Sequence, residues 1–320
     1  MKVDKIIAIQ GVFPIILFAL LPFLPESPRY LLIKDRYEEA SAVLHKLHTP
    51  DEAKIELAQI ANQMRIDRTL PSSYWAMFKK PSYRKRSFLA LGTTCGIACS
   101  GILVINNYGP ILYAGLGYGP EKQLIYQAGW MTLGLGAGVL GMLWVDRLPR
   151  PKLIALGLAG CIICLIVEAA LVAQFVPSDN TPALQAAVAM FFVYVIVYES
   201  CLDGTQFVYC GELFPTHLRA KGMNLCVVGI TLMNLIWLQV APVAFEEIGW
   251  KYYLCFIICG SVAAIIIWFV FPDTWGVPLE EIAAIFGDED ELYQASIEDG
   301  KVESDEEKNE VVREEKVVAK

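Results

Sequence analysis

Long apolar stretches alternate with short charged segments along most of this chain. A bilayer core requires about 20 apolar residues per spanning helix, because no backbone polar group can stay unpaired in lipid. Seven stretches meet this requirement: Ile6–Leu24, Ser87–Tyr108, Leu124–Val145, Leu153–Val176, Ala183–Cys210, Met223–Phe245 and Tyr252–Phe271. The pattern predicts an all-α membrane protein with seven transmembrane helices.

Residues 25–86, between the first two stretches, have an amphipathic pattern instead. Apolar residues recur there at helical spacing. They are Ala40, Val43, Leu44 and Leu47 within Lys34–His48, and Ile55, Ala58 and Ile60 within Asp51–Met64. We expect a first transmembrane helix in 1–24, a linker of short amphipathic helices in 25–86, a six-helix bundle in 87–271 and a tail in 272–320.

Basic residues gather on alternate connections, which predicts the orientation in the membrane. Residues 25–86 carry twelve Lys and Arg. The connections after the third and fifth stretches add Arg147, Arg150, Lys152, Arg219 and Lys221. The other connections hold only Lys122 and Lys251. Because cytoplasmic loops carry the excess of Lys and Arg, we expect the N-terminus outside and the C-terminus in the cytoplasm.

The acidic balance of the chain comes from its last segment. From Gly287 to Lys320 there are 13 Asp and Glu against 5 Lys and Arg, a net charge of −8 that equals the formal charge of the whole protein. The preceding residues are therefore neutral overall. Of the whole chain, 55% is hydrophobic, which is typical of a polytopic membrane protein. Such composition predicts a solvated acidic extension that is disordered beyond about residue 287.

The sequence offers no constellation typical of an enzyme. All nine cysteines lie in or beside apolar stretches, where cysteine behaves as a small hydrophobe. The spacing Cys161-x-x-Cys164 lacks a second ligand pair, and the three histidines form no metal-binding pattern. Without a nucleotide-binding loop, catalytic triad or metal cluster, we expect no enzyme, no ATP-driven pump and no cofactor. No feature suggests a nucleic-acid partner.

Three acids interrupt the fourth and fifth stretches, at Glu168, Glu199 and Asp203. An ionisable side chain in a spanning helix is costly, so Glu199 is expected to face a bundle interior or a water-filled cavity. The alternative is a structural acid that is protonated or paired. Glu168 can equally lie close to a helix end.

A row of glycines marks the third stretch, at Gly129, Gly134, Gly136, Gly138 and Gly141. Small residues let the backbones of neighbouring membrane helices approach closely. The pattern favours a closely packed helix over a binding role.

Five motifs resemble those of the sugar porters of the major facilitator superfamily. They follow the order of that family, and the resemblance covers essentially all of residues 6–287. They are Pro25-Glu-Ser-Pro-Arg-Tyr-Leu-Leu32, Asn106-Asn-Tyr-Gly-Pro110, Asp146-Arg-Leu-Pro-Arg-Pro151, Glu212-Leu-Phe-Pro-Thr-His-Leu-Arg-Ala-Lys-Gly222 and Pro272-Asp-Thr-Trp-Gly-Val-Pro-Leu-Glu-Glu-Ile282. The fourth is similar to the family's tenth-helix signature, which ends a helix in a charged turn.

The resemblance implies the linker and C-terminal half of a twelve-helix carrier, with the first apolar stretch equivalent to helix six. Helices one to five would be missing, either from a truncated gene model or from a half-length product. Full carriers hold a solute between two six-helix halves and rock them around it. The implied function is transport of a sugar or sugar-like solute across the plasma membrane by alternating access, with the N-terminal half as a partner.

The resemblance also implies a solute site. The family's helix-ten glutamate falls on Glu199 and its helix-eleven asparagine on Asn234. A sugar needs amides, carboxylates and aromatic edges around a mostly apolar cavity. Asn106, Asn107 and Gln206 are further candidates, with Asp203 as another polar group. For the asparagines, hydrogen bonding between helices is an equal alternative.

Several family positions depart from the sugar-binding pattern. The glutamine pair of helix seven falls on Ile97 and Ala98, and its asparagine on Leu103. The helix-ten tryptophan falls on Phe207, and a helix-eight asparagine on Gly134. These losses remove several hydrogen-bonding groups for a hexose, so a different or larger sugar, or a solute that is not a sugar, stays open.

A conformational latch is the second site that the resemblance implies. In the family, charges of the third motif pair with charges of the fourth and hold one face closed. Asp146, Arg150, Glu212 and Arg219 occupy those positions, and Glu26 and Arg29 of the first motif join the predicted latch. Pro149 and Pro151 replace a glycine and an arginine of the family and stiffen the turn. Alternatively, the charged residues of these motifs only reflect the excess of charge in cytoplasmic loops. That explanation fits the basic residues Arg147 and Lys152 better than the acidic Glu212.

Other function classes stay open at this point. Seven spans with an outside N-terminus are also the topology of a signalling receptor, although the long second segment and the five motifs argue against one. A nutrient sensor or regulatory half-carrier would bind solute without flux. Proton coupling in the family depends on an acid of the first helices, so symport and facilitated diffusion are not separated by this sequence.

Overall fold

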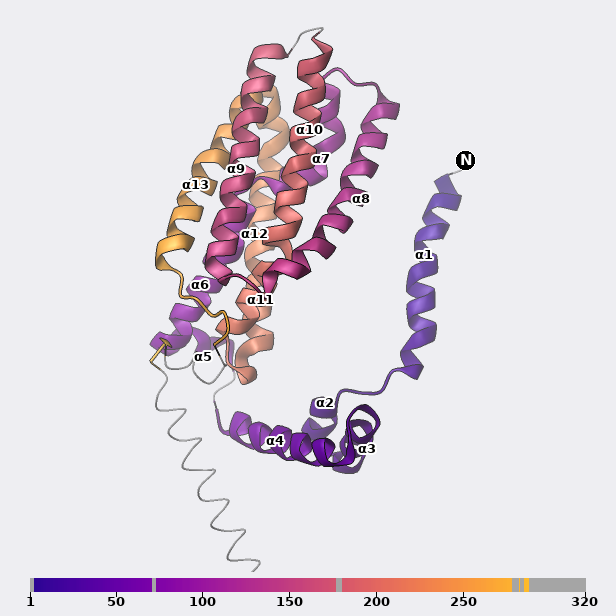
Figure 1. Cartoon of the computed structure of the whole chain (residues 1–320), viewed down its shortest axis with the longest axis vertical. Coiled ribbons are helices and arrows are strands. Elements are labelled where there is room, and N and C mark those ends of the chain that lie inside the picture. The colour runs from indigo at the N-terminus through magenta and orange to yellow at the C-terminus, as the bar shows by residue number, and fades with distance from the viewer. Residues whose placement is uncertain (1–2, 71–72, 177–179, 278–281, 283–284, 288–320) are drawn as a thin grey trace, which may run out of the picture. The chain divides into compact units, whose positions relative to one another are not determined.

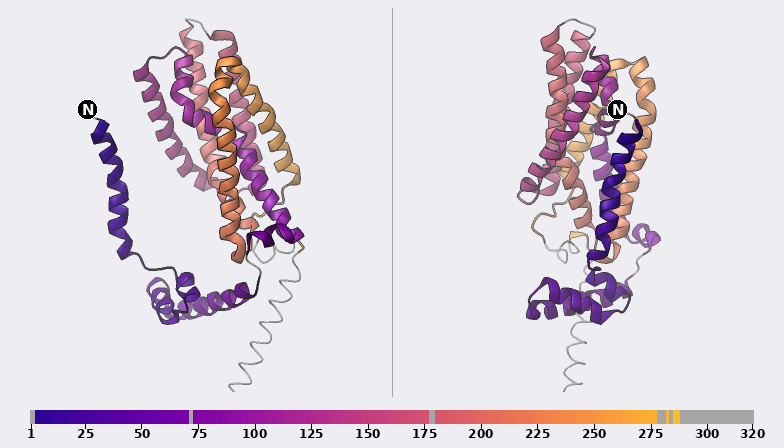
Figure 2. Two further views of the ribbon diagram at one scale, coloured as in Figure 1. Left: turned by 180° about the vertical axis from the view of Figure 1, so that it is seen from behind. Right: turned by 90° about the vertical axis from the view of Figure 1, so that its right-hand side faces the viewer.

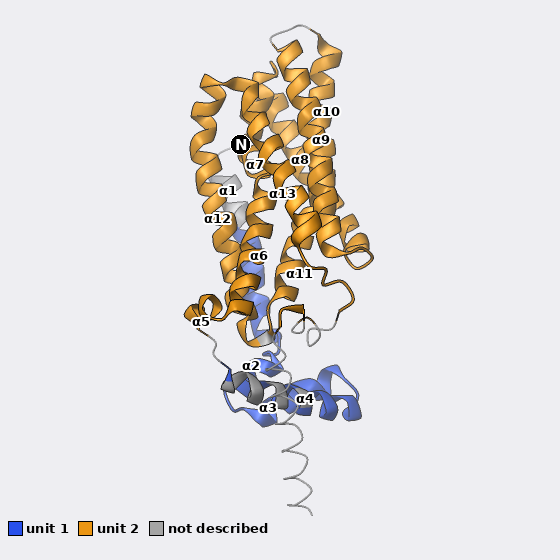
Figure 3. Cartoon of the chain, turned by 90° about the vertical axis from the view of Figure 1, so that its left-hand side faces the viewer, with its two compact units in different colours: residues 1–71 blue, residues 72–320 orange. Residues whose placement is uncertain are grey.

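The computed structural model describes residues 3–70, 73–176, 180–277, 282 and 285–287. Every regular element within these ranges is a helix, and no strand occurs among them (Figure 1). The chain divides into two compact units, residues 1–71 and 72–320 (Figure 3). The expected acidic extension beyond residue 287 lies outside the described residues. The expected boundaries at residues 24, 86 and 271 stay predictions.

Unit 1 contains α1 and three short helices that share a small core. Its elements are α1 (Val3–Leu20), the 3-10 helix η1 (Leu21–Phe23), α2 (Pro28–Ile33), α3 (Tyr37–Leu47) and α4 (Pro50–Thr69). The core of α2, α3 and α4 consists of Leu31, Leu32, Ala40, Leu44, Ala53 and Leu57. The two expected amphipathic helices are therefore present as α3 and α4.

The buried face of α4 differs from the predicted one. Ile55 and Ala58 are exposed, whereas Ala53 and Leu57 are buried. Residues four apart lie on one face of a helix, so Ala53 and Leu57 form a stripe that Ile60 continues at the rim. The prediction chose the neighbouring stripe, because α4 carries apolar residues on more than one side and only its partners select the buried one.

Unit 2 contains the remaining helices. They are α5 (Tyr74–Lys79), α6 (Pro81–Ala98), α7 (Ile102–Gly115), α8 (Pro120–Val145), α9 (Arg150–Phe175), α10 (Thr181–Tyr198), the π-helix η2 (Glu199–Asp203), α11 (Gly204–Leu213), α12 (Thr216–Glu247), the 3-10 helix η3 (Gly249–Lys251) and α13 (Tyr252–Val270). Figure 2 shows that the long helices run side by side as a bundle.

Six helical segments among the described residues are long and apolar enough to cross a membrane, and they confirm six of the predicted spans. They are Pro81–Gly115, Pro120–Val145, Arg150–Phe175, Thr181–Leu213, His217–Glu247 and Gly249–Val270. The first expected span falls on α1 and η1, where the described apolar part, Gly11–Phe23, is shorter than a span. Large apolar side chains such as Ile258 and Phe269 point outward, 63% and 79% exposed, as expected for a lipid-facing surface.

The span predicted at Ser87–Tyr108 begins at Pro81 in the structure, six residues earlier than predicted. Proline is favoured at the first position of a helix because its missing N–H needs no partner there. Arg86 is nevertheless buried in this helix. Its Nη1 donates to the carbonyl oxygen of Leu213 at 2.9 Å, and its guanidinium lies 4.5 Å from the ring centroid of Phe286. These contacts accommodate a charge that the hydropathy pattern had placed outside the span.

A break divides the span Pro81–Gly115 into α6 and α7. Gly101 lies between them with φ of 87°, a conformation that residues with a side chain rarely adopt. A Cβ atom at Gly101 would also lie 3.0 Å from the ring of Phe256. Across the bundle, the hydroxyl of Tyr194 donates to the carbonyl oxygen of Ser100 at 2.9 Å and fixes the break. Helix α7 is therefore a separate half-helix attached through a glycine.

Candidate functional site

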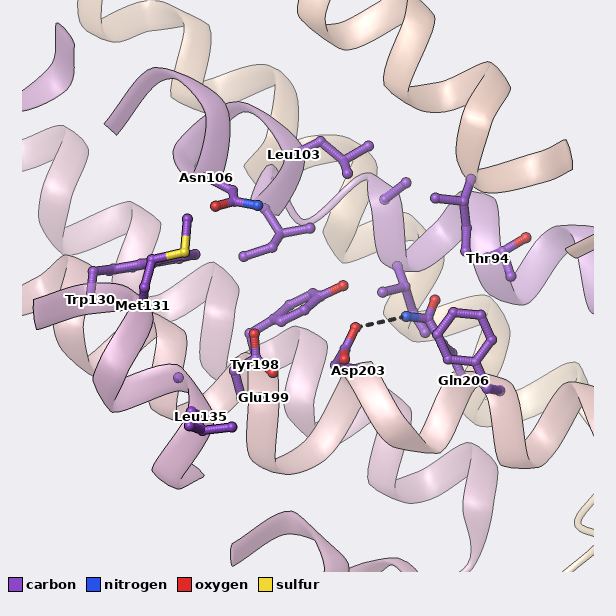
Figure 4. A pocket seen from close by; sticks show the side chains of 16 residues that line it. Thr94, Leu103, Asn106, Trp130, Met131, Leu135, Tyr198, Glu199, Asp203 and Gln206 are labelled. Atoms are coloured by element: carbon purple, nitrogen blue, oxygen red, sulfur yellow. Dashed lines mark hydrogen bonds between the residues drawn. The ribbon is translucent and has the colours of Figure 1, made fainter. Parts of the chain in front are cut away.

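A cavity of about 440 Å³ opens on the surface of unit 2, where Asn106, Met131 and Leu135 of its lining are exposed. Its walls come from α6, α7, α8, η2, α11 and α12, with one residue from α10. The lining residues are Thr94, Ile97, Ala98, Ile102, Leu103, Asn106, Trp130, Met131, Gly134, Leu135, Tyr198, Glu199, Asp203, Gln206, Phe207 and Ile230 (Figure 4). This mixture of a mostly apolar wall and a few polar groups is typical of a small-molecule site.

The two acids of the cavity stand on a π-helical turn. Residues Glu199–Asp203 form η2, which joins α10 to α11 without ending the span. A π-turn inserts extra backbone into a helix and is frequent at functional sites. This insertion turns Tyr198, Glu199 and Asp203 toward the same space as Gln206.

A glycine of α8 makes room for this turn. An ideal Cβ atom on Gly141 would lie 2.8 Å from the backbone oxygen of Ser200 and 3.1 Å from that of Glu199. The Ser200 hydroxyl in turn donates to the carbonyl oxygen of Ala137 at 3.2 Å. The close approach of α8 therefore sets the position of the Glu199 backbone, as the glycine row predicted for packing.

Hydrogen bonds fix some polar groups of the cavity and leave others available. The amide Nε2 of Gln206 donates to Oδ1 of Asp203 at 3.3 Å (Figure 4). The indole Nε1 of Trp130 is buried and has no hydrogen-bond partner among the described residues. The cavity thus offers carboxylate acceptors and an amide at Asn106.

Charge is the second property of this cavity. Two carboxylates line it, and its described lining contains no Lys, Arg or His. A second cavity of about 370 Å³ lies on the α8 side of η2, and Glu199 and Asp203 line both spaces. The charged side chains that this chain presents to a solute in either cavity are therefore all acidic.

Four of the six predicted solute-site residues line the cavity, namely Asn106, Glu199, Gln206 and Phe207. Asn107 does not; its Nδ2 donates to the carbonyl oxygen of Leu103 in its own helix at 2.7 Å. Asn234 of α12 is also absent from the lining, and its Oδ1 is buried without a partner among the described residues. The family departures at Ile97, Ala98, Leu103 and Gly134 all face the cavity, which makes its wall more apolar.

Trp130 and Tyr198 are lining residues that sequence reasoning did not select. Both are aromatic residues within spanning stretches, a composition that core packing shares. No sequence signal separates a lining tryptophan from a packed one, because the difference depends on which neighbours surround it.

A charge cluster lies at the other predicted site. Nη2 of Arg150 lies 3.1 Å from Oδ1 of Asp146 and 3.2 Å from Oε1 of Glu212. Thr274 donates its hydroxyl to the other oxygen of Glu212 at 2.5 Å, and Trp275 donates its indole N–H to the carbonyl oxygen of Asp146 at 3.0 Å. The fifth motif, which contains Thr274 and Trp275, is therefore hydrogen-bonded to Asp146 of the third motif and Glu212 of the fourth.

The structure does not bring every predicted latch residue into this cluster. Nε and Nη2 of Arg219 are buried and have no hydrogen-bond partner among the described residues. Glu26 and Arg29 lie in unit 1, where both are exposed, so their role in a latch stays a prediction. Sequence reasoning quoted the segment that contains Thr274 and Trp275 without assigning them a contact.

We expect Arg150→Gln to lower the free energy of unfolding by about 1 to 3 kcal/mol, the cost typical of removing hydrogen bonds to a charged partner. The Arg150 side chain is only 7% exposed and contacts two carboxylates. Arg147→Gln is the matched control, because Arg147 is exposed and forms no side-chain pair among the described residues. Thermal unfolding in detergent measures both; equal losses would contradict the role given to Arg150.

Comparison with known proteins identifies the family of this chain. A family model described as "Sugar (and other) transporter" matches residues 5–286. The chain belongs to the sugar transporter family. It is thus an integral, multi-pass membrane protein of the major facilitator superfamily, as the five motifs predicted.

Relatives within the sugar transporter family are longer than this chain. The MFS-type transporter criB of Aspergillus cristatus is 28% identical over 302 residues, which cover 92% of this chain and 61% of criB. A probable quinate permease of Aspergillus clavatus is 28% identical over 285 residues, 82% of this chain and 52% of the permease. The chain therefore spans little more than half the length of these relatives.

Solved structures of a major facilitator superfamily transporter share the fold. The proton:xylose symporter XylE bound to 6-bromo-6-deoxy-D-glucose superposes with a TM-score of 0.69 at 23% identity, covering 87% of this chain and 58% of XylE. The inward-open form of XylE from E. coli gives a TM-score of 0.62. At this identity the likeness shows the architecture of the bundle alone.

Proposed function

We propose that this chain forms one wall of the solute site of a secondary carrier that moves a sugar or sugar-like solute by alternating access. The observation that carries the proposal is the cavity around η2, where Glu199, Asp203, Asn106 and Gln206 interrupt an apolar wall. Membership of the sugar transporter family supports the same function. The chemistry is binding and release, without a covalent step.

The lining chemistry suits a neutral polyhydroxylated solute. Each hydroxyl of such a solute both donates and accepts hydrogen bonds. Glu199 and Asp203 accept, whereas the amide of Asn106 can donate. Trp130 and Phe207 supply aromatic surface for the apolar face of a sugar ring. A carboxylate-bearing solute would meet two like charges, so this wall disfavours it.

A second wall completes the site in this proposal. Full carriers place their solute between two six-helix halves, and this chain spans 61% of criB. We therefore propose an N-terminal half as its partner. We place the assembly in the plasma membrane, with the N-terminus of this chain outside and its C-terminus in the cytoplasm. A proton is proposed as a second transported species.

The charge cluster of Asp146, Arg150, Glu212, Thr274 and Trp275 is proposed to act as the latch. It ties the end of α8, the start of α9, the end of α11 and the segment after α13 together. A contact of this kind favours one arrangement of the helices, and a bias of about 3 kcal/mol changes the ratio of two states by roughly two orders of magnitude. Solute binding would shift that ratio toward opening.

The neighbouring asparagines of α7 provide a test. We expect Asn106→Ala to weaken binding of D-glucose or D-xylose about threefold to tenfold, the effect of one neutral hydrogen bond. Asn107→Ala should leave the affinity unchanged, because Asn107 does not line the cavity and its amide is hydrogen-bonded within α7. Equilibrium binding of radiolabelled sugar to the chain in lipid nanodiscs measures both variants.

Equal effects of the two variants, or none from Asn106→Ala in a chain that binds sugar, would contradict the assignment of the cavity. Uptake is then measured with the chain joined to an N-terminal half of a family member. Binding without uptake would favour the alternative function of a nutrient sensor over a carrier.

A further inference from the structure

The short helix α5 is fixed against the bundle of unit 2, beside one end of α6 (Figure 3). The hydroxyl of Ser73 accepts a hydrogen bond from the backbone N–H of Ala76 at 3.1 Å and caps the helix. Nδ2 of Asn224 on α12 donates to the hydroxyl of Tyr74 at 3.0 Å. Met77 is fully buried and belongs to the core of the bundle. These contacts fix α5 in place although it has only six residues.

The outer side of α5 presents two large aromatic side chains. Trp75 is 78% exposed and Phe78 is 39% exposed. Only Lys80 separates α5 from the spanning segment Pro81–Gly115, so both rings lie within six residues of the start of that segment. Tryptophan is enriched at the boundary between hydrocarbon and water, because its ring is apolar and its N–H needs a polar partner. The outer side of α5 is therefore suited to a membrane surface.

Basic residues lie beside these rings. Five of the eight residues 79–86 are Lys or Arg, and no Asp or Glu occurs in residues 68–120. Lys79, Arg84 and Lys85 are exposed. None of these three forms an ion pair among the described residues. The bundle therefore carries three exposed cations here that no acid of the described part of the chain contacts.

The helix packed against α5 contributes further positive charge. Nζ of Lys221 on α12 lies 5.8 Å from the ring centroid of Tyr74. Nζ of Lys85 lies 5.6 Å from the ring centroid of Phe286, a contact that leaves the ammonium charged. The α5 surface is the set of exposed side chains at this place, namely Trp75, Phe78, Lys79, Arg84 and Lys85.

The α5 surface continues into the lipid-facing surface of the bundle. Arg84 and Phe88 are four positions apart and therefore lie on the same face of α6. Phe88 is 61% exposed within the apolar stretch Ser87–Tyr108. Four residues of an α-helix rise about 6 Å, and the headgroup layer on each side of a bilayer is roughly 5 to 8 Å thick. With the ring of Phe88 in hydrocarbon, the guanidinium of Arg84 thus lies among the headgroups.

We propose that the α5 surface docks on the headgroups of anionic phospholipids, with Trp75 and Phe78 at the boundary of the hydrocarbon and the three cations against phosphate and carboxylate groups. Charge complementarity selects this occupant, because the surface carries Lys79, Arg84 and Lys85 and no acid. The orientation proposed above puts it in the cytoplasmic leaflet, which carries the anionic lipids. The docking requires only that the chain spans a membrane, and it does not rest on solute transport.

Native mass spectrometry of the full chain in detergent measures the lipid selectivity. Phosphatidylserine and phosphatidylcholine with identical acyl chains are titrated separately. We expect the wild type to prefer phosphatidylserine. Lys79→Gln/Arg84→Gln should weaken phosphatidylserine binding about tenfold to thirtyfold, because one basic residue at an anionic surface contributes roughly fivefold. Phosphatidylcholine binding should stay unchanged. A wild type that does not distinguish the two lipids would overturn the proposal.

The matched control removes the same amount of charge elsewhere. Lys122 at the start of α8 and Lys251 on η3 are exposed basic residues outside the α5 surface. Lys122→Gln/Lys251→Gln should leave phosphatidylserine binding unchanged. An equal loss in both double variants would show that only the net charge of the protein matters, which contradicts a defined docking surface.

Tryptophan fluorescence tests the position of α5 without altering its charge. The chain is placed in nanodiscs whose lipids carry bromine atoms on acyl carbons close to the headgroup, because bromine quenches indole rings that it contacts. We expect Trp75→Phe to lower the quenched fraction of the emission. An unchanged quenched fraction would place Trp75 in water and overturn the docking, whatever the charge variants show.

The acidic extension Gly287–Lys320 is the competing occupant of this surface. In that case rising salt would release the extension and increase phosphatidylserine binding. We expect a decrease instead, because salt screens the attraction between the headgroups and the three cations; an increase would overturn the proposal. No sugar enters these experiments, so their failure leaves the proposed function standing, and a failed sugar-binding test leaves the docking surface standing.

Discussion

Gly141→Ala is expected to lower the free energy of unfolding by about 1 to 3 kcal/mol, the range for overpacking a close contact. The added methyl group would lie 2.8 Å from the backbone oxygen of Ser200 and 3.0 Å from its Cα atom. Backbone atoms cannot rotate away as a side chain can, so α8 and η2 must separate. Since Glu199 stands on η2, the same variant is expected to weaken sugar binding.

Gly136→Ala on the same helix is the matched control. No atom lies within 4 Å of a Cβ at that position. Alanine in an open helical position is favoured over glycine by about 0.5 to 1 kcal/mol, because glycine loses more backbone entropy on folding. Thermal unfolding should therefore show a less stable Gly141→Ala protein and a slightly more stable Gly136→Ala protein. Sugar binding is measured on both variants. A Gly141→Ala protein as stable as Gly136→Ala would contradict the close packing of η2.

The second prediction concerns Glu199, which lines both cavities. Glu199→Gln keeps the shape of the side chain and removes its charge. We expect sugar affinity to fall about tenfold to a hundredfold, because hydrogen bonds to a charged group contribute roughly 1.5 to 3 kcal/mol. Glu121→Gln, at an exposed position of α8, should leave the affinity unchanged. Radiolabelled sugar binding to the chain in nanodiscs measures both.

Selectivity gives this prediction a second readout. The wild-type cavity presents two carboxylates, so binding of quinate, which carries a carboxylate, is expected to be weak. Removing one of the two like charges should raise the affinity for quinate relative to D-glucose. An unchanged ratio would show that Glu199 does not contact the solute, even if stability and sugar affinity both fall.

Hydropathy alone predicted most of the helical architecture. The spans from α6 to α13 have lengths and apolar content that leave few alternatives, because a polypeptide in lipid must satisfy its backbone hydrogen bonds within each helix. Hydropathy predicted the buried face less well for the amphipathic helices outside the spans. On α4 it selected Ile55 rather than Leu57 for the core, since an amphipathic pattern with apolar residues on two sides fits two registers.

The candidate site was predictable only in part. Glu199 attracted attention because an acid is costly inside a span, and the structure places it in a cavity. Asn106 and Asn107 are adjacent and chemically identical in the sequence, yet only Asn106 faces the cavity. The helical rotation of α7 separates them, and that rotation is set by packing around Gly101.

The sequence by itself determined the membrane class, the order of the spans and the family, because each depends on composition and local motifs. Tertiary structure alone decided which polar side chains share a space. The π-turn of η2, its fit against Gly141 and the approach of Trp130 arise from contacts between helices far apart in the chain. The burial of Glu168 has the same origin, since a local pattern shows an acid but not the neighbours that surround it.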